Sequence, residues 1–211
     1  MPIIILSIFS IAAMIGGMYF SGHLSVKPKP SIKGTLFDKA IPVKPFSLID
    51  HHNKKFSLKN FKGKWSFIFF GYTHCPDICP NTMNALNITS IELSNYPKFF
   101  SNTQFIFVSV DPGRDTPEIL AKYIRFFGDN FIAVTGSTTK ITAFARNFGI
   151  LHKVTPHKDP SKYTVAHSGH ILLINPKAEW QALLRYPHTS KSKNKSKHII
   201  YDYTNIRGYI K

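Results

Sequence analysis

The sequence predicts an α/β domain, in which helices cover a sheet with parallel central strands, behind an N-terminal membrane anchor. Three apolar runs, residues 65–70, 104–110 and 131–134, are rich in aromatic or β-branched residues, as expected of buried strands. Apolar positions at helical spacing follow the first two runs, in residues 80–93 and 117–127. This alternation of strand and helix is typical of layered α/β domains.

The membrane anchor is predicted from the N-terminal segment. Pro2 to Phe20 contain no charged residue and match the length of a membrane-spanning helix. A cleaved signal peptide is the alternative, with Ser21 and Gly22 as a weak small-residue cleavage site. We expect residues 1–21 to be a transmembrane anchor or an uncleaved signal.

The residues after the anchor give conflicting indications about its orientation. Lys27, Lys29 and Lys33 follow the apolar segment and no Lys or Arg precedes it, which by itself favours a cytoplasmic domain. A paired thiol site is better suited to an oxidising compartment. We therefore expect the domain on the periplasmic, extracytoplasmic side of the membrane, at the inner membrane of a bacterium.

Two segments are predicted to flank the folded domain. Residues 22–45 carry prolines among small and basic residues, and we expect an extended tether there. Residues 188–198 (HTSKSKNKSKH) form a basic, low-complexity loop that we expect to be disordered. Residues 199–211 are expected to form a short terminal helix. One face of that helix carries three apolar side chains, Ile199, Tyr203 and Ile206.

The domain between these flanks is predicted to span residues 46–187. It opens with strands at 46–50 and 55–58, joined by a turn in which His51 and His52 are exposed.

The elements after the central strands are predicted from caps and breakers. Thr116 caps a helix with Pro117 at its first position. A further helix runs from Thr138 or Thr139 to Phe148. Residues 152–162 are polar and contain two prolines, which indicates a loop. Three late strands are expected, at 163–165, 171–174 and 181–184, with residues 167–170 pairing with the second of these or bending into it.

The formal net charge of +16 does not by itself indicate a nucleic-acid partner. The lysines are spread along the chain, and no nucleic-acid-binding motif accompanies them. A solvated basic surface, or attraction to anionic lipid or an acidic protein, accounts for the charge. We therefore expect no nucleic acid among the partners.

Both cysteines of the chain lie in Gly71–Pro80 (GYTHCPDICP), directly after a predicted buried strand. Pro80 fits the first turn of a helix, so Cys79 is expected at the lip of that helix and Cys75 in the loop before it. The partial positive charge of a helix N-terminus favours thiolate over thiol. Two such thiolates can close into a disulfide or bind a soft metal ion.

The spacing of the two cysteines leaves these chemistries open. Thioredoxin-type redox sites use CxxC, and this motif has one residue more, which lets the sulfurs spread around an ion. The same loop still permits a disulfide. A structural disulfide or two unreactive thiols is the plainer interpretation. A metal site would need a third ligand, and the histidines are the candidates.

Three motifs in order resemble one family. GYTHCPDICP, SVDPGRDTPE and YTVAHS, each next to an apolar strand, resemble the Sco/SenC family of membrane-anchored, copper-binding proteins of cytochrome c oxidase assembly. The resemblance covers residues 36–187. It implies a thioredoxin-like fold, a central mixed sheet flanked by helices, in residues 46–187. It also implies that Cys75, Cys79 and His167 are copper ligands.

Other polar residues near these motifs are given lesser roles. The family usually has an aspartate directly before the histidine, and this chain has Ala166 there. Position 166 is therefore not expected to contribute a charge to the site, whereas the imidazole of His167 is unaffected. His74 and His170 are expected to be non-ligating. The acidic and basic residues of the second motif are expected to form an ion pair that fixes the loop and to help cap the next helix: Asp111, Arg114 and Asp115.

Two functions from different classes follow. A site of two sulfurs and one nitrogen suits three-coordinate Cu(I), whereas zinc would want a fourth ligand. The resemblance therefore implies a copper metallochaperone for the binuclear copper site of cytochrome c oxidase. Its partners would be the copper-bearing oxidase subunit and, further, other copper chaperones or thiol reductants. The alternative is a membrane-anchored thiol-disulfide oxidoreductase in which Cys75 and Cys79 are the redox-active pair and no metal is required.

Overall fold

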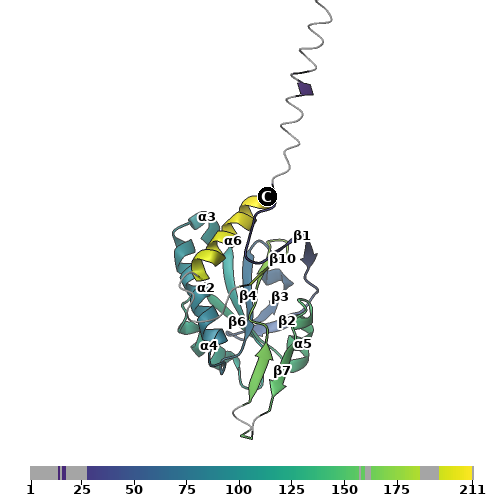
Figure 1. Ribbon diagram of the computed structural model, residues 1–211. Coiled ribbons are helices and arrows are strands. Elements are labelled where there is room, and N and C mark those ends of the chain that lie inside the picture. Colours follow the sequence, from purple (N-terminus) through teal and green to yellow (C-terminus); the bar gives the residue numbers. More distant parts are fainter. Residues whose placement is uncertain are drawn as a thin grey trace, which may run out of the picture.

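The computed structural model describes residues 14, 16–17, 28–156, 158–159, 163–185 and 195–210, the side chains of residues 167 and 195 excepted. Eight strands form one mixed sheet, in the order β1-β10-β9-β4-β5-β6-β2-β3 (Figure 1). Their bounds are β1 Thr35–Pro42, β2 Ser47–Asp50, β3 Lys55–Ser57, β4 Trp65–Gly71, β5 Thr103–Ser109, β6 Phe131–Thr135, β9 Ile171–Ile174 and β10 Glu179–Leu184.

The helices connect the central strands and cover the sheet. They are α2 Ile78–Ser94, α3 Pro97–Phe100, α4 Pro117–Arg125, α5 Thr138–Arg146 and α6 Lys195–Tyr209, with a 3-10 turn at Leu58–Asn60. The order strand–helix–strand–helix–strand of the sequence prediction is confirmed from β4 to β6. The predicted cap of α4 is also confirmed, because the Thr116 side chain accepts from the backbone N–H of Ile119.

The centre of the sheet is parallel, as the apolar runs predicted. β4 pairs with β5 and β5 with β6, all in parallel register, while the outer pairs are antiparallel. Every residue of β4 is buried. Parallel strands place their carboxyl ends at one edge of the sheet, so Gly71 and Ser109 lie opposite each other there.

Alternate side chains of β4 face two helical layers. The Phe67 ring packs on Tyr203 of α6, with centroids 4.9 Å apart, and Phe69 packs on Phe107. Phe70, on the opposite face, packs on Phe144 of α5. Figure 1 shows α2, α3, α4 and α6 on one side of the sheet and α5 on the other.

Helix α2 differs in part from its predicted apolar stripe. Met83, Leu86 and Leu93 are buried as expected, but Ile88 and Ile91 are exposed. Polar positions face the core in their place, because small hydroxyl side chains can hydrogen bond to the helix's own carbonyls. These positions are Thr82, Thr89 and Ser90.

The tether prediction is wrong for residues 35–42. These residues form β1, an edge strand that pairs antiparallel with β10 through Leu36↔Ala182 and Ile41↔Trp180. Proline suggested a tether, but an edge strand tolerates a proline such as Pro42 at its end. The folded domain therefore begins before residue 46.

The late part of the domain contains a second, two-stranded sheet that the sequence did not predict. β7, His152–Thr155, pairs antiparallel with β8, Thr164–His167, and both were expected to belong to other arrangements. Residues 152–155 are therefore strand and not loop. β8 does not pair with β9 within the described residues, because residues 168–170 bend between two sheets. In Figure 1 this β7–β8 arm projects from the end of the molecule opposite α6.

The terminal helix begins earlier than expected. Residues 195–198 were predicted to belong to the disordered loop but form the first turn of α6. The predicted apolar face is confirmed, since Ile199, Tyr203 and Ile206 are all buried. Burial of that face against β4 and α2 stabilises the helix. The basic composition of residues 195–198 gives no sign of this tertiary contact. Residues 188–194 lie outside the described part.

The predicted anchor, residues 1–21, lies almost entirely outside the described residues. Only residues 14, 16 and 17 of it are described, and they are helical. Among the residues described, no helix is long and apolar enough to cross a membrane.

Candidate metal centre

The two cysteines lie where β4 ends and α2 begins. Cys75 is half-buried in the loop, and Cys79 is buried in the first turn of the helix. The helix starts at Ile78, so Cys79 is inside it and not at its lip as expected. The backbone N–H of Cys79 points at the sulfur of Cys75, 3.4 Å away. Both residues are thiols, without a disulfide between them.

Gly71 leaves room for the buried sulfur. A methyl group added there would lie 2.9 Å from Cys79 Sγ and 2.7 Å from the Phe107 ring. Real side chains do not approach so closely, so only glycine lets Cys79 pack against the end of β4. The glycine at the start of the motif thus belongs to the site.

The expectation that the helix N-terminus favours the thiolate is wrong for Cys79. Its pKa is raised, first because its thiol hydrogen bonds to Cys75 and next because burial penalises the charged form. A hydrogen bond from the Tyr72 backbone acts in the opposite direction. The Cys79 sulfur faces the core and Cys75, so these effects on its pKa outweigh that of the helix dipole.

A buried carboxylate fixes the loop that carries Cys75. Asp115, fully buried, accepts from the Thr73 backbone N–H at 3.1 Å and from the Thr73 hydroxyl at 2.6 Å. It also accepts from the Ser109 hydroxyl at 2.5 Å. Burial raises the pKa of Asp115, and these three hydrogen bonds oppose that rise.

The predicted ion pair in the second motif is confirmed, and it reaches further than expected. Arg114 Nε lies 2.6 Å from Asp111 Oδ2. The Tyr163 hydroxyl donates to Asp111 Oδ1 at 2.6 Å, and the Arg114 guanidinium lies 3.6 Å from the centre of the Tyr163 ring. The same guanidinium lies 5.8 Å from the ring of Tyr72, next to the cysteine loop.

The backbone of the third predicted ligand lies in the β7–β8 arm. His167 is the last residue of β8, opposite His152 of β7. Its side chain lies outside the described part. A hydrogen bond from the Val165 backbone to the Tyr72 side chain brings β8 to the cysteine loop. Among the side chains described, no three His, Cys, Asp or Glu converge on one point, so the three-ligand set stays a prediction.

The two histidines predicted to be non-ligating have hydrogen-bond partners on their own segments. His74 is exposed, with Nδ1 3.0 Å from the Thr73 hydroxyl. His170 is half-buried, with Nδ1 2.6 Å from the Ser168 hydroxyl. The pKa of His170 is lowered, mainly by burial and then by Arg185.

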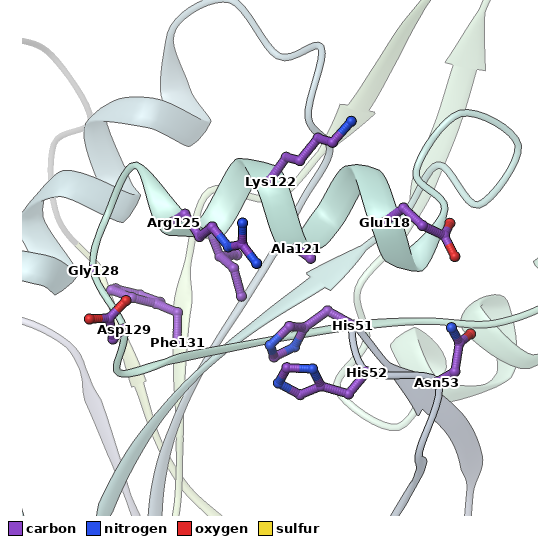
Figure 2. Close-up of a pocket in the computed structure, with 11 residues that line it drawn as sticks. His51, His52, Asn53, Glu118, Ala121, Lys122, Arg125, Gly128, Asp129 and Phe131 are labelled. Atoms are coloured by element: carbon purple, nitrogen blue, oxygen red, sulfur yellow. The ribbon is translucent and has the colours of Figure 1, made fainter.

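A separate pocket of about 510 Å³ lies between α4 and the turn that joins β2 to β3. In Figure 2 the rings of His51 and His52 lie together below α4, with Arg125 extending toward them and Lys122 pointing away. His51 is not merely an exposed turn residue, because its Nδ1 accepts from the backbone N–H of Ala133 at 3.2 Å. None of the residues that line this pocket belongs to the cysteine loop.

Comparison with known protein families gives a match that includes the residues of this candidate site. Residues 36–200 match the SCO1/SenC family. The chain belongs to the SCO1/SenC family. The matched range takes in the cysteine loop, residues 111–115 and the β7–β8 arm, and it starts within β1, where the structure places the beginning of the domain.

Individual Sco proteins agree with this assignment. The SCO2-like protein of Rickettsia prowazekii is 34% identical over 175 residues, covering 81% of this chain and 83% of that protein. The mitochondrial SCO2 homolog of mouse is 35% identical over 131 residues, covering 62% of this chain, which spans about half (51%) of that protein. The crystal structure of Arabidopsis thaliana ScoI with copper bound superposes with a TM-score of 0.68 at 31% identity, covering 79% of this chain and 98% of that one. This match confirms the mixed α/β, thioredoxin-like fold.

Sequence reasoning missed the polar residues that hold the loops of this candidate site together. Thr73, Ser109 and Tyr163 were read as parts of a loop or strand, with no role of their own. One signal was present: Ser109 ends a continuously apolar strand, and a hydroxyl there must find a buried partner. The Ser109 hydroxyl bonds to Asp115 nearby in the sequence, but Thr73 and Tyr163 find their partners 42 and 52 positions away, so only the fold identifies those pairs.

Proposed function

We propose that this protein is a copper metallochaperone that delivers copper to the binuclear copper site of cytochrome c oxidase. The observation that supports it best is the pair of thiols at the sheet edge, where the Cys79 N–H points at the Cys75 sulfur. Family membership supports the same proposal, because a Sco relative has been solved with copper bound.

The donor set fits a soft metal ion. Thiolates select Cu(I), and an imidazole such as that of His167 is an acceptable third ligand. Two sulfurs and one nitrogen suit Cu(I), whereas a structural zinc site wants four protein ligands. Copper is the cargo of this site, held by Cys75, Cys79 and His167.

Unequal burial of the two sulfurs suggests how the cargo leaves. Cys79 is fully buried, while Cys75 lies in a loop and is partly exposed. An incoming thiolate of the acceptor reaches copper from the Cys75 side and replaces that ligand first. Cys79 then holds the ion until a second acceptor ligand binds, so copper is never released to water.

Thiol-disulfide exchange is a second candidate function, favoured by the proximity of the two cysteines, in which the Cys79 N–H lies 3.4 Å from the Cys75 sulfur. The Cys75 thiolate attacks a partner disulfide and forms a mixed disulfide, releasing one partner thiol. Cys79 then attacks Cys75, which releases the second partner thiol and leaves a Cys75–Cys79 disulfide. Two electrons pass to the partner, and its two released sulfurs take up protons, one lost by Cys79 and one from water, which prepares cysteines of an acceptor for copper.

The proposed setting is the extracytoplasmic face of a membrane. The uncharged segment from Pro2 to Phe20 supports an anchor, and the basic chain suits an anionic lipid surface. The proposed partners are the copper-bearing subunit of cytochrome c oxidase, together with copper chaperones or thiol reductants that load or reduce the site. Nucleic acid is not among them.

Anaerobic Cu(I) titration of the reduced full-length chain in detergent tests this proposal. We expect one Cu(I) per chain, binding lost in the double variant Cys75→Ser/Cys79→Ser, and affinity weakened in His167→Ala. If His167→Ala left the Cu(I) affinity unchanged while the cysteines still cycled between dithiol and disulfide, the result would favour the oxidoreductase. No binding by the wild-type chain would refute the metallochaperone.

A further inference from the structure

The loop between β5 and α4, residues 111–115, contacts both segments that carry the predicted ligands. At one end it meets Thr73, two residues before Cys75. Near its other end it meets Tyr163, which directly precedes β8. The two ligand-bearing segments are distant in sequence, and this loop is the described element with side chains bonded to both.

The contact on the cysteine side is a buried carboxylate with several donors. Asp115 receives two hydrogen bonds from Thr73, backbone and hydroxyl, and a third from Ser109 at the end of β5. Ser109 belongs to the central sheet and bonds to the same carboxylate as Thr73. The position of Thr73 is therefore tied through Asp115 to the central sheet. The carboxylate thus sets where the chain enters the CxxxC motif.

The contact on the histidine side is a clasp around one aromatic ring. The Tyr163 hydroxyl donates to Asp111, and Arg114 covers the ring at 3.6 Å while pairing with Asp111 at 2.6 Å. A cation over an aromatic face and a charge-assisted hydrogen bond both favour a single orientation. The clasp therefore fixes Tyr163, the residue directly before β8.

The β7–β8 arm depends on such a clasp, since the main sheet does not hold it. β7 and β8 pair with each other in a sheet of their own, and residues 168–170 link β8 to β9 without regular structure. An arm attached in this way can swing relative to the core unless side chains secure it. Tyr163 and the backbone of Val165, which reaches Tyr72, provide that attachment.

We propose that residues 111–115 are a positioning bracket that sets the separation between the two thiols and β8, and with it the geometry of the copper site. This inference rests on the proposed copper function. Asp115 positions the cysteine side, while Asp111 and Arg114 position the histidine side through Tyr163. The two halves act on different ligands and are therefore separable by mutation.

Two conservative variants test the halves. Asp115→Asn keeps the size of the side chain but replaces one acceptor oxygen with an amide that cannot accept from Thr73 or Ser109. Tyr163→Phe removes only the hydroxyl that donates a hydrogen bond to Asp111. Anaerobic competition of the full-length chain with a chromophoric Cu(I) chelator should show about 10-fold weaker binding for each, the usual loss on removing a group that orients a ligand.

A double-mutant cycle with His167→Ala separates positioning from general stability. With the imidazole absent, Tyr163→Phe should cause no further loss of Cu(I) affinity, because it acts only through His167. Asp115→Asn should still weaken binding in that background. The thiolate-to-Cu(II) charge-transfer absorption should shift in Asp115→Asn and stay in place when Tyr163→Phe is added to His167→Ala.

Matched controls are available on the exposed surface. Tyr201→Phe and Asp129→Asn make the same chemical changes at exposed positions and should leave Cu(I) affinity unchanged. Thermal unfolding of each variant checks that the chain is folded. If Asp115→Asn unfolds the domain, Thr73→Val removes only one of the three hydrogen bonds and takes its place.

The outcomes distinguish this inference from the proposed function. If the wild-type chain binds Cu(I) but Tyr163→Phe has no effect, or has its full effect in the His167→Ala background, the bracket is refuted and the metallochaperone stands. If Asp115→Asn and Thr73→Val, both folded, bind as tightly as the wild-type chain, the cysteine half of the bracket is refuted. Failure of the wild-type chain to bind Cu(I) refutes both proposals.

Discussion

The cysteine loop and the pocket under α4 make opposite use of similar side chains. At the cysteine loop, a carboxylate is fully buried and accepts three hydrogen bonds. In the pocket, two imidazoles and several charged groups surround about 510 Å³. Among the residues described there, no charged group lies within 4.0 Å of an opposite charge.

The difference shows that the candidate metal site is the region whose polar groups are fixed by buried hydrogen bonds, and not the region that lines this pocket. A site for one ion needs ligands held in place, and buried hydrogen bonds to a strand end achieve that. A pocket lined by solvent-exposed charges needs no such support. Variants of the two regions should therefore differ in their effects on copper binding even where their effects on stability are alike.

Gly71→Ala should have the largest effect at the cysteine loop. The added methyl group overlaps Cys79 Sγ and the Phe107 ring, so the buried sulfur must shift. We expect the free energy of unfolding to fall by about 1–3 kcal/mol, as for other overpacked cores, together with weaker Cu(I) binding. Chemical denaturation and Cu(I) competition measure the two effects.

The control for that variant is Gly208→Ala in α6, where an added methyl group meets no atom within 4 Å. It should leave copper binding unchanged and stabilise the helix slightly. If Gly71→Ala bound Cu(I) as tightly as the wild-type chain, the close packing of Cys79 against β4 would be unimportant to the site.

Ser109→Ala should have an intermediate effect. Its hydroxyl donates to Asp115 and accepts from the backbone N–H of Asp111, so both ends of the bracket lose a partner. Asp115 keeps its two bonds from Thr73, and we expect a loss of about 1–2 kcal/mol in the free energy of unfolding. Denaturant unfolding measures it, with the exposed Ser94→Ala as the matched control. Equal stability of the two variants would contradict the role given to Ser109.

The pocket should show the smallest effect, and only as a dependence on pH. The pKa of His51 is lowered by burial first and then by the neighbouring His52, so the unfolded chain binds a proton more readily than the folded one. The stabilisation from neutral His51 is therefore complete above about pH 6.5 and is lost as the pH falls below it. Copper binding should be indifferent to this residue.

His51→Asn tests that dependence, because the Asn amide oxygen can replace Nδ1 as the acceptor for Ala133 without titrating. Denaturant unfolding between about pH 8 and pH 5 should show a smaller loss of stability in the variant than in the wild-type chain. Parallel pH profiles would contradict the assignment. A changed Cu(I) affinity in the variant would contradict the separation of the two regions.

Much of the architecture was predictable because it follows from local patterns. Continuous apolar runs predicted β4, β5 and β6, and Thr116 before Pro117 predicted the start of α4. The resemblance of three motifs predicted the Sco family and its fold. The failures occurred where tertiary contacts override composition. Prolines argued against the strand β1, a polar sequence against the strand β7, and lysines against the first turn of α6. Each of these elements becomes ordered only against a partner strand or the core.

By itself, the sequence determined which residues are the candidates for the site: two cysteines at the end of a buried strand, with a histidine-bearing segment after them. Their chemistry depends on residue type and on position relative to a strand end, which are local properties. Only the tertiary structure decided that Cys79 meets Cys75 and is buried, which in that order raise the pKa of Cys79, and which groups hold the loops. Asp115 meets Thr73 across 42 positions and Tyr163 meets Asp111 across 52, and no local pattern encodes pairings at that separation.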